Sequence, residues 1–199
     1  MGFDFISQMN QLHMLIDLSH AGQRTIAQGI AASKTPVAIS HTGCRDLVDL
    51  PRNTRDSDLR ALAAKGGVAG IYFMPFLRAS GQPHAADLIA HIEHAVNVCG
   101  EDHVGLGTDG LVSGFPMSDA FKAFHRKDVE ERRKAGLAAP GESVDVYTLV
   151  PEYNDSRRFK HLADDLIRRG WSSTRIEKIL GANFARLFTE VWGSGGTGF

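Results

Sequence analysis

The sequence predicts an α/β fold in which parallel strands alternate with helices. Short apolar runs, such as VAGIYF at 68–73, are separated by longer stretches whose apolar residues recur at helical spacing. Three of the runs end at or beside a His or an Asp. Strands that are apolar on both faces and joined through helices are typical of a parallel sheet covered on both sides. The 199 residues, 43% of them hydrophobic, suffice for one such domain.

The elements of this alternation can be placed in chain order. The apolar runs predict four strands, at residues 14–18, 36–40, 68–73 and 104–109. Helical spacing predicts four helices before and between them, at residues 3–12, 23–33, 57–65 and 85–98. The last of these carries Leu88, Ile92 and Ala95 on one face, which is the pattern of an amphipathic helix with a buried side.

The pattern changes after Asp109. Residues 110–156 form an excursion that contains one strongly charged helix, expected at about 119–134 with a solvated face. Helical spacing resumes from Arg157, and Trp171-Ser172-Ser173 is predicted to open a helix at a Ser cap. We therefore expect one domain over residues 1–192, followed by a disordered, glycine-rich tail at residues 193–199.

Composition excludes several classes of function. Lys and Arg number 22 and Asp and Glu number 23, so the net charge of -1 provides no basic field for nucleic acid. No apolar run approaches the roughly 20 residues of a membrane span, and the N-terminus lacks the pattern of a signal peptide. Cys44 and Cys99 show no metal-type CxxC pairing. These features predict a reduced, cytoplasmic protein.

Two folds fit the strand order. In a (β/α)8 barrel the active site lies at the carboxyl ends of the strands, where this sequence places its polar residues. Four strand-helix units would then be about half of a barrel. A doubly wound open sheet competes, but it favours a glycine-rich loop after the first strand, and here that strand is followed by His20-Ala21-Gly22. The sequence therefore favours part of a (β/α)8 barrel.

His20 and His41 each follow one of two successive strands. Neighbouring parallel strands lie about 4.8 Å apart, so two imidazoles at the same level can share a zinc ion. A single His at a strand end can also serve as a hydrogen-bonding cap.

Asp109 ends the fourth predicted strand. A carboxylate at this position can act as a general base or as a metal ligand. It can also form a turn before Gly110.

Further polar residues also have both a functional and a structural explanation. Arg52 and Asn53 lie in the loop after the second strand, where an arginine fork can grip a substrate carboxylate or stay solvated. His91 and His94 are three residues apart on the helix expected at 85–98, away from the strand ends, and packing or solvation accounts for them better than a metal. Cys44 is near His41 in sequence, and nothing else indicates a nucleophile.

Together these motifs resemble the renal (membrane) dipeptidase family, peptidase family M19. The matching stretches include DLSHAG, PVAISHTG, PRN and GLGTDG, in the family's order, and the match spans most of the chain outside residues 110–156. The resemblance implies the C-terminal half of a (β/α)8 barrel of the metallo-dependent hydrolase type. It also implies hydrolysis of dipeptides through a metal-bound hydroxide, at a site with two zinc ions.

The resemblance assigns roles to particular residues. His20 and His41 correspond to the ligands of the second zinc, Arg52 to the arginine that binds the terminal carboxylate of the dipeptide, and Asp109 to the aspartate that handles the proton. Asn53 belongs to the same PRN motif and is expected to contact substrate. The family is often dimeric. His13 stands where the family usually has Gly.

One departure from the family is large. The H-x-D pair that holds the first zinc and the Glu that bridges the two metals have no counterpart in this sequence. We therefore expect a truncated barrel that associates with a missing N-terminal half or with a second copy as a homodimer. Two alternatives remain: a catalytically inactive half-barrel that acts as a dimeric binding or scaffold module, and another metal-dependent amidohydrolase.

Overall fold

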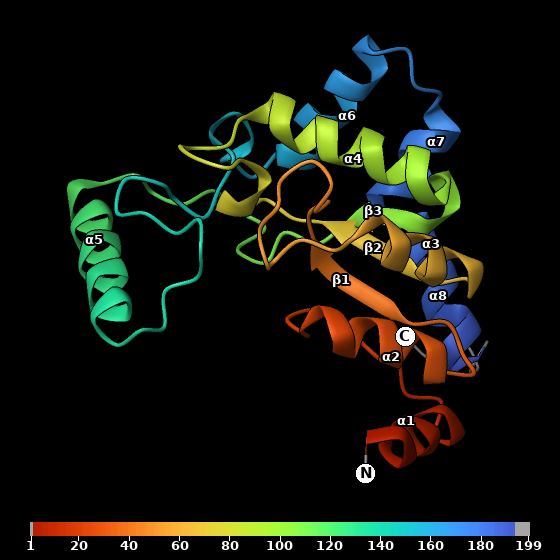
Figure 1. Ribbon diagram of the computed structural model, residues 1–199. Helices are drawn as coiled ribbons and strands as arrows, with labels where there is room; N and C mark the ends of the chain where they lie inside the picture. Colours follow the sequence, from red (N-terminus) through yellow and green to blue (C-terminus); the bar gives the residue numbers. More distant parts are fainter. Residues whose placement is uncertain (1, 194–199) are drawn as a thin grey trace.

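The computed structural model describes residues 2–193, and its centre is a three-stranded parallel sheet (Figure 1). The strands are β1 (Ala38–Thr42), β2 (Val68–Ile71) and β3 (Val104–Leu106), paired in the order β1-β2-β3. Ala38 pairs with Val68, and Ala69 pairs with Val104. The predicted α/β fold and the parallel strand direction are confirmed.

The first predicted strand, at residues 14–18, is much reduced. It contributes one isolated parallel bridge, between Asp17 and Ala38. The Leu18 N–H donates to the Ala38 carbonyl and the Ala38 N–H donates to the Ile16 carbonyl, both at 2.9 Å. This segment therefore lies beside β1 in strand-like geometry, but so short a ladder is not a full strand.

The helices follow the predicted ranges closely. Their bounds are α1 (Gly2–Gln11), α2 (Gln23–Ala32), α3 (Asp56–Ala64), α4 (Ala85–Cys99), α5 (Asp119–Lys134), α6 (Arg158–Arg168), α7 (Ser173–Glu177) and α8 (Asn183–Trp192). Short 3₁₀ turns lie at Pro75–Leu77, Glu101–His103 and Pro151–Tyr153, and a π turn at Lys178–Ala182 joins α7 to α8. The Ser172 hydroxyl accepts from the Arg175 N–H, which confirms the predicted cap.

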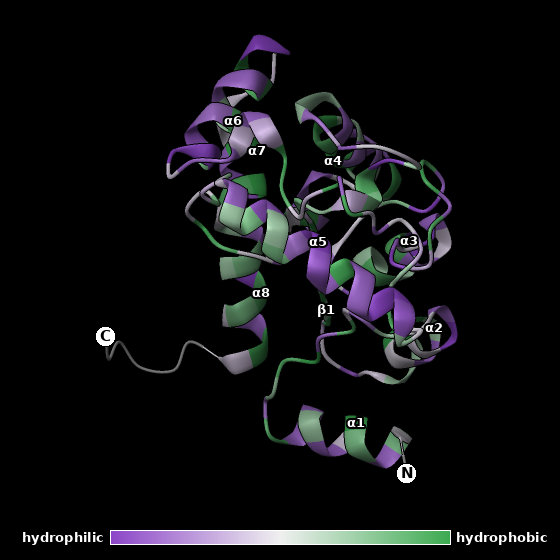
Figure 2. Ribbon diagram, turned by 90° about the vertical axis from the view of Figure 1, so that its left-hand side faces the viewer, coloured by the Kyte–Doolittle hydropathy of each residue, from purple (hydrophilic) through white to green (hydrophobic). Residues whose placement is uncertain are grey.

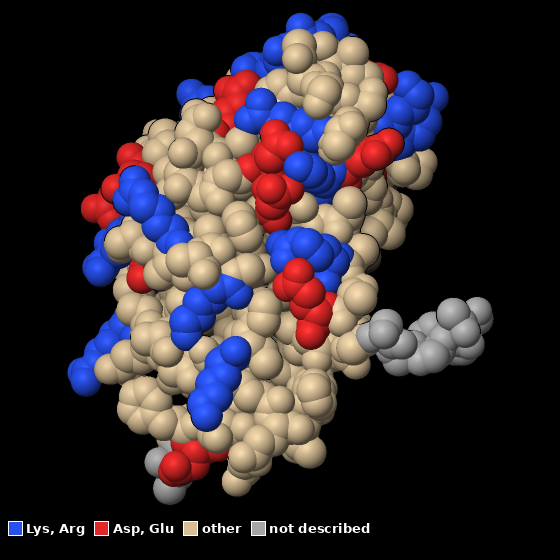
Figure 3. All heavy atoms as spheres, turned by 90° about the vertical axis from the view of Figure 1, so that its right-hand side faces the viewer, with Lys and Arg blue, Asp and Glu red and all other residues tan. Residues whose placement is uncertain are grey.

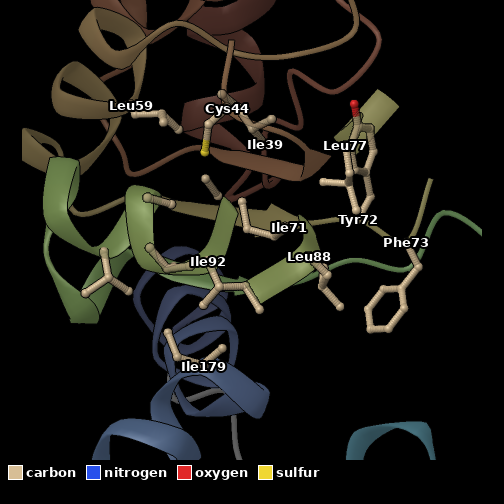
Figure 4. Close-up of a cluster of buried hydrophobic side chains, with 14 of the residues drawn as sticks. Ile39, Cys44, Leu59, Ile71, Tyr72, Phe73, Leu77, Leu88, Ile92 and Ile179 are labelled. Atoms are coloured by element: carbon tan, nitrogen blue, oxygen red, sulfur yellow. The ribbon is translucent and has the colours of Figure 1, made fainter. Parts of the chain in front are cut away.

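The core fills both sides of the sheet. In the main cluster, Leu59 of α3 and Ile92 of α4 meet Ile39 and Ile71 of the strands, and all four are fully or almost fully buried (Figure 4). A smaller cluster joins Ala38 and Val68 to Leu187 and Val191 of α8. Side chains alternate between the faces of a strand, so α8 covers the face opposite α3 and α4. This two-sided cover explains why the strands are apolar throughout.

The excursion carries α5 to one side of the molecule, away from the sheet (Figure 1). Most of α5 is hydrophilic (Figure 2), and Val129 is its one buried residue. The solvated face expected for this helix is therefore present. The last predicted segment, at 193–199, lies outside the described residues apart from Gly193.

The surface carries both signs of charge. On the face shown in Figure 3, Lys and Arg side chains are interspersed with Asp and Glu. None of the helices within residues 2–193 combines the length and the apolar character needed to cross a membrane. Cys44 and Cys99 are both free thiols.

Candidate metal centre

His20, His41 and Asp109 converge at the carboxyl ends of the strands. One ligand atom of each residue lies within 4.8 Å of the ligand atoms of the other two. The two imidazole rings have their centroids 4.8 Å apart in an edge-to-face arrangement, and His41 Nε2 lies 3.7 Å from Asp109 Oδ1. The structure thus brings together the two histidines and the carboxylate that the sequence singled out.

The backbone around this cluster is unusual. His41 lies within β1, whereas His20 follows the bridged segment and Asp109 follows β3. His20 and Asp109 both have left-handed backbone conformations, with φ values of 62° and 51°. Side chains other than glycine adopt this conformation at a cost of about 1 kcal/mol or more, and such residues concentrate at functional sites.

The histidine donors fit a zinc ion. His41 Nε2 is buried and has no hydrogen-bond partner among the described residues, so its position favours a ligand over a structural role. Burial lowers the pKa of His41 below its ordinary value, although the nearby charge of Asp109 opposes the shift. The lowered pKa favours the neutral form of His41, which is the form that binds zinc. Two His nitrogens and one carboxylate make a donor set typical of catalytic zinc sites.

Arg52 reaches into the same cluster from the loop after β1. Its Nη1 donates to His20 Nδ1 at 2.7 Å, and its Nη2 donates to Asp109 Oδ2 at 3.3 Å. The guanidinium also lies 5.6 Å from the centre of the Phe76 ring. A guanidinium only donates hydrogen bonds, so Arg52 competes with a cation for the Nδ1 lone pair of His20.

Asn53 is placed differently from Arg52. It is fully buried, and its Nδ2 donates to the carbonyls of Val48 and Phe76 at 2.8 and 3.0 Å. Its Oδ1 accepts the Tyr72 hydroxyl. All of its polar atoms are therefore engaged within the protein. Asn53 holds the loop that carries Arg52, whereas the sequence predicted a contact with substrate.

Three residues near the cluster were given no role from the sequence. Asp17, Ser19 and Ser40 form a hydrogen-bonded group behind His41, with Asp17 as the common acceptor. Partial desolvation raises the Asp17 pKa, but hydrogen bonds from Ser40 and Ser19 outweigh it and hold this pKa below its ordinary value. The Asp-x-Ser spacing of an Asx turn was the available signal for Asp17 and Ser19.

A cavity of about 450 Å³ opens beside the cluster. His20, Arg52 and Asp109 are among its polar lining residues, and Phe76 and Phe124 are among its apolar ones. Many of the remaining lining residues belong to the excursion, including His125 and Val129 of α5. The excursion therefore forms one wall of the cavity, which its polar sequence did not indicate.

Other candidate residues have structural contacts. His91 is buried, with Nδ1 accepting from the Cys44 N–H at 2.8 Å and Nε2 donating to the Leu77 carbonyl at 3.1 Å. His94 pairs with Asp56 at 2.7 Å. Burial raises the pKa of the Cys44 thiol, which disfavours the reactive thiolate. These contacts agree with the prediction that packing or solvation accounts for His91 and His94.

The fold and the site define a class of protein. The chain has a parallel α/β sheet with two histidines and a carboxylate gathered at its strand ends, beside an arginine, and these donors suit a divalent metal ion. The chain belongs to the membrane dipeptidase family, peptidase family M19, whose family model matches residues 1–122. His20, His41, Arg52 and Asp109 all lie within the matched region.

Individual proteins and solved structures are similar to this chain. An uncharacterized Klebsiella pneumoniae protein encoded in the pqqA 5' region is 29% identical over 196 residues, covering 96% of this chain and 60% of its own. An uncharacterized dipeptidase of Schizosaccharomyces pombe is 39% identical over 111 residues, covering 54% and 27%. The crystal structure of an amidohydrolase from Pseudomonas aeruginosa matches with a TM-score of 0.77 and 29% identity, over 97% of this chain and 57% of that one. The chain thus spans only part of the length of these relatives.

Proposed function

We propose that this chain carries the second-metal half of a zinc-dependent dipeptidase site. In this proposal His20 and His41 hold zinc, Asp109 handles the proton, and Arg52 binds the carboxylate of a dipeptide. The observation that carries the proposal is the convergence of His20, His41 and Asp109 within 4.8 Å of one another at the strand ends. The family membership supports the same reading.

The substrate follows from the groups that face the cavity. Arg52 presents a planar fork of donors, which suits the two oxygens of a carboxylate. The cavity of about 450 Å³ lies within the range of small-molecule sites. Arg52 Nη2 and Asp109 Oδ2 are 3.3 Å apart, so a substrate whose carboxylate pairs with Arg52 has its amide bond close to Asp109. These features favour a short peptide with a free C-terminus.

The reaction divides between the bound ion and the protein. When bound, zinc supplies polarisation of a carbonyl oxygen and activation of water. The protein side chains do the rest: Arg52 orients the substrate through its carboxylate, and Asp109 takes a proton from the attacking water and returns it to the leaving amine. Asp109 lies between the candidate zinc ligand and the candidate carboxylate-binding group, with Oδ1 3.7 Å from His41 Nε2 and Oδ2 3.3 Å from Arg52 Nη2.

The rest of the site needs additional protein. We infer that the sheet and the bridged segment at 14–18 belong to a (β/α)8 barrel, of which residues 1–192 form one part. The match to 57% of the amidohydrolase chain, at a TM-score of 0.77, supports this arrangement. A second copy of this chain lacks the H-x-D pair and the bridging Glu as well, so the ligands of a first metal would then come from an N-terminal half.

A panel of three ligands tests the proposal on the zinc-loaded chain. Calorimetric titration with Ala-Ala, with its C-terminal amide and with the cyclic dipeptide should give binding for Ala-Ala alone, and any hydrolysis should follow the same order. Equal binding of the cyclic dipeptide would favour the other amidohydrolase reading. Zinc uptake without binding of any of the three would favour a non-catalytic module and contradict the dipeptidase role.

A further inference from the structure

A chain of hydrogen bonds leads from Asp17 through Ser40 to His41. Ser40 Oγ lies 2.6 Å from Asp17 Oδ2 and 3.0 Å from His41 Nδ1. The other Asp17 oxygen, Oδ1, accepts three bonds, from the Ser19 N–H at 3.0 Å, the Ser19 hydroxyl at 2.8 Å and the Ser40 N–H at 3.0 Å. Both carboxylate oxygens are therefore engaged.

Counting protons fixes the direction of each bond. An ionised carboxylate only accepts, so the single Ser40 hydroxyl proton must lie on the 2.6 Å contact with Asp17. The Ser40 oxygen is then an acceptor toward His41, and the proton on their 3.0 Å contact must come from Nδ1. The opposite direction would leave two oxygens 2.6 Å apart with no proton between them.

We propose that Asp17 is a positioning residue that acts through Ser40 to hold His41 in its Nδ1–H tautomer. The lone pair of His41 is thereby placed on Nε2, the buried atom that has no hydrogen-bond partner among the described residues and that faces Asp109 at 3.7 Å. The inference rests on the proposed function, because the Nε2 lone pair of His41 is needed only if it binds a cation together with His20. Carboxylate groups that orient a ligating histidine commonly change metal affinity 10- to 100-fold when they are removed.

Asp17→Asn makes a sharp test because it should reverse the chain of bonds. Three donors surround the Oδ1 position, so the amide oxygen of Asn would occupy it and the NH2 group would face Ser40. Ser40 would then accept from the amide and donate its own proton to His41 Nδ1. The expected result is a switch of His41 to the Nε2–H tautomer without loss of the side chain.

The experiment is ¹⁵N NMR of the metal-free chain at about pH 8, where imidazoles are neutral, with zinc affinity measured in parallel. The His41 signals are assigned by their loss in His41→Gln. We expect protonated Nδ1 in the wild type, protonated Nε2 in Asp17→Asn, and loss of the Nδ1–H preference in Ser40→Ala. Zinc affinity should fall about 10- to 100-fold in both variants. Asp164→Asn, which removes an equal charge from an exposed pair with Lys160, should change neither reading.

The outcomes separate this inference from the proposed function. A wild-type His41 protonated on Nε2, or a tautomer unchanged in both Asp17→Asn and Ser40→Ala, would overturn the role of Asp17. If Asp17→Asn does not fold, Ser40→Ala alone decides the same question. If the tautomer switches as expected but the wild-type chain takes up no zinc, the positioning role stands and the proposed zinc site fails.

Discussion

Arg52 Nη2 lies 3.3 Å from Asp109 Oδ2, although the two residues are 57 positions apart in the chain. Arg52 comes from the loop after β1 and Asp109 follows β3, and the pair contacts both histidines, Arg52 at His20 Nδ1 and Asp109 at His41 Nε2. The Arg52 guanidinium, which we propose binds the substrate carboxylate, therefore lies directly beside the candidate cation site.

Replacing Arg52 by Leu should strengthen zinc binding and weaken substrate binding. The change removes a positive charge beside the ion and frees His20 Nδ1 from its 2.7 Å hydrogen bond, so zinc affinity should rise by about tenfold. The loss of a charge-assisted carboxylate contact should weaken Ala-Ala binding by about 10- to 100-fold. Arg52→Lys keeps the charge and is the control. A fall in zinc affinity in Arg52→Leu would contradict this account of Arg52.

Asp109→Asn should abolish turnover while leaving the fold intact. Asn tolerates the left-handed backbone of this position, where φ is 51°, and the side chain of Asp109 is 23% exposed. The amide can neither carry the proton nor bind zinc as an anion, so zinc affinity should also fall by about tenfold or more. Asp49→Asn, at a side chain that is 79% exposed, serves as the control. Hydrolysis that survives unchanged in Asp109→Asn would exclude the proton-transfer role.

Phe124 should contribute to side-chain preference without contributing to stability. It lines the cavity but is 69% exposed, so its truncation leaves the core unchanged. Phe124→Ala should weaken the binding of dipeptides with a large apolar side chain by about five- to tenfold, with little effect on Ala-Ala. Phe5→Ala, at a residue 63% exposed outside this cavity, should affect neither. Equal losses for large and small dipeptides would contradict a specificity role.

His91 should make stability depend on pH. Burial lowers its pKa from an ordinary 6.5 to about 4, so the unfolded chain binds a proton between these values and the folded chain does not. The free energy of unfolding should therefore fall as the pH decreases, by about 2 kcal/mol between about pH 7.5 and 5.0 from this residue. In His91→Gln this contribution disappears. Urea denaturation should therefore show that the difference in the free energy of unfolding between the wild type and His91→Gln becomes smaller toward low pH. A difference that stays constant with pH would show that the pKa of His91 is not lowered in the folded protein.

The helices and the cluster of polar residues could be predicted from the sequence because both follow from regular patterns. The apolar spacing along 85–98 fixes which face of α4 is buried, and parallel strands bring their carboxyl ends to one edge, so His20 and His41 had to lie near each other. The segment at 14–18 was overestimated because an apolar run predicts a strand whether or not a long ladder forms.

The remaining features depend on tertiary placement. The register between Asp17 and Ala38 brings Asp17 against Ser40, and no local pattern encodes that register. Asn53 follows Arg52 directly, yet the turn of the loop buries one side chain and sends the other to the site. The path of residues 110–156 decides that Phe124 lines the cavity, and polar loops carry little periodic signal.

The central claim is that His20 and His41 bind one zinc ion together. Zinc content and affinity, measured by competition with a coloured chelator on the wild-type chain and on His20→Ala, His41→Ala and His161→Ala, test it most directly. We predict about one zinc per chain, with affinity reduced more than about tenfold in the first two variants and unchanged in His161→Ala, whose side chain pairs with Asp155 elsewhere. Zinc binding that is absent from the wild type, or equally strong in all three variants, would contradict the claim.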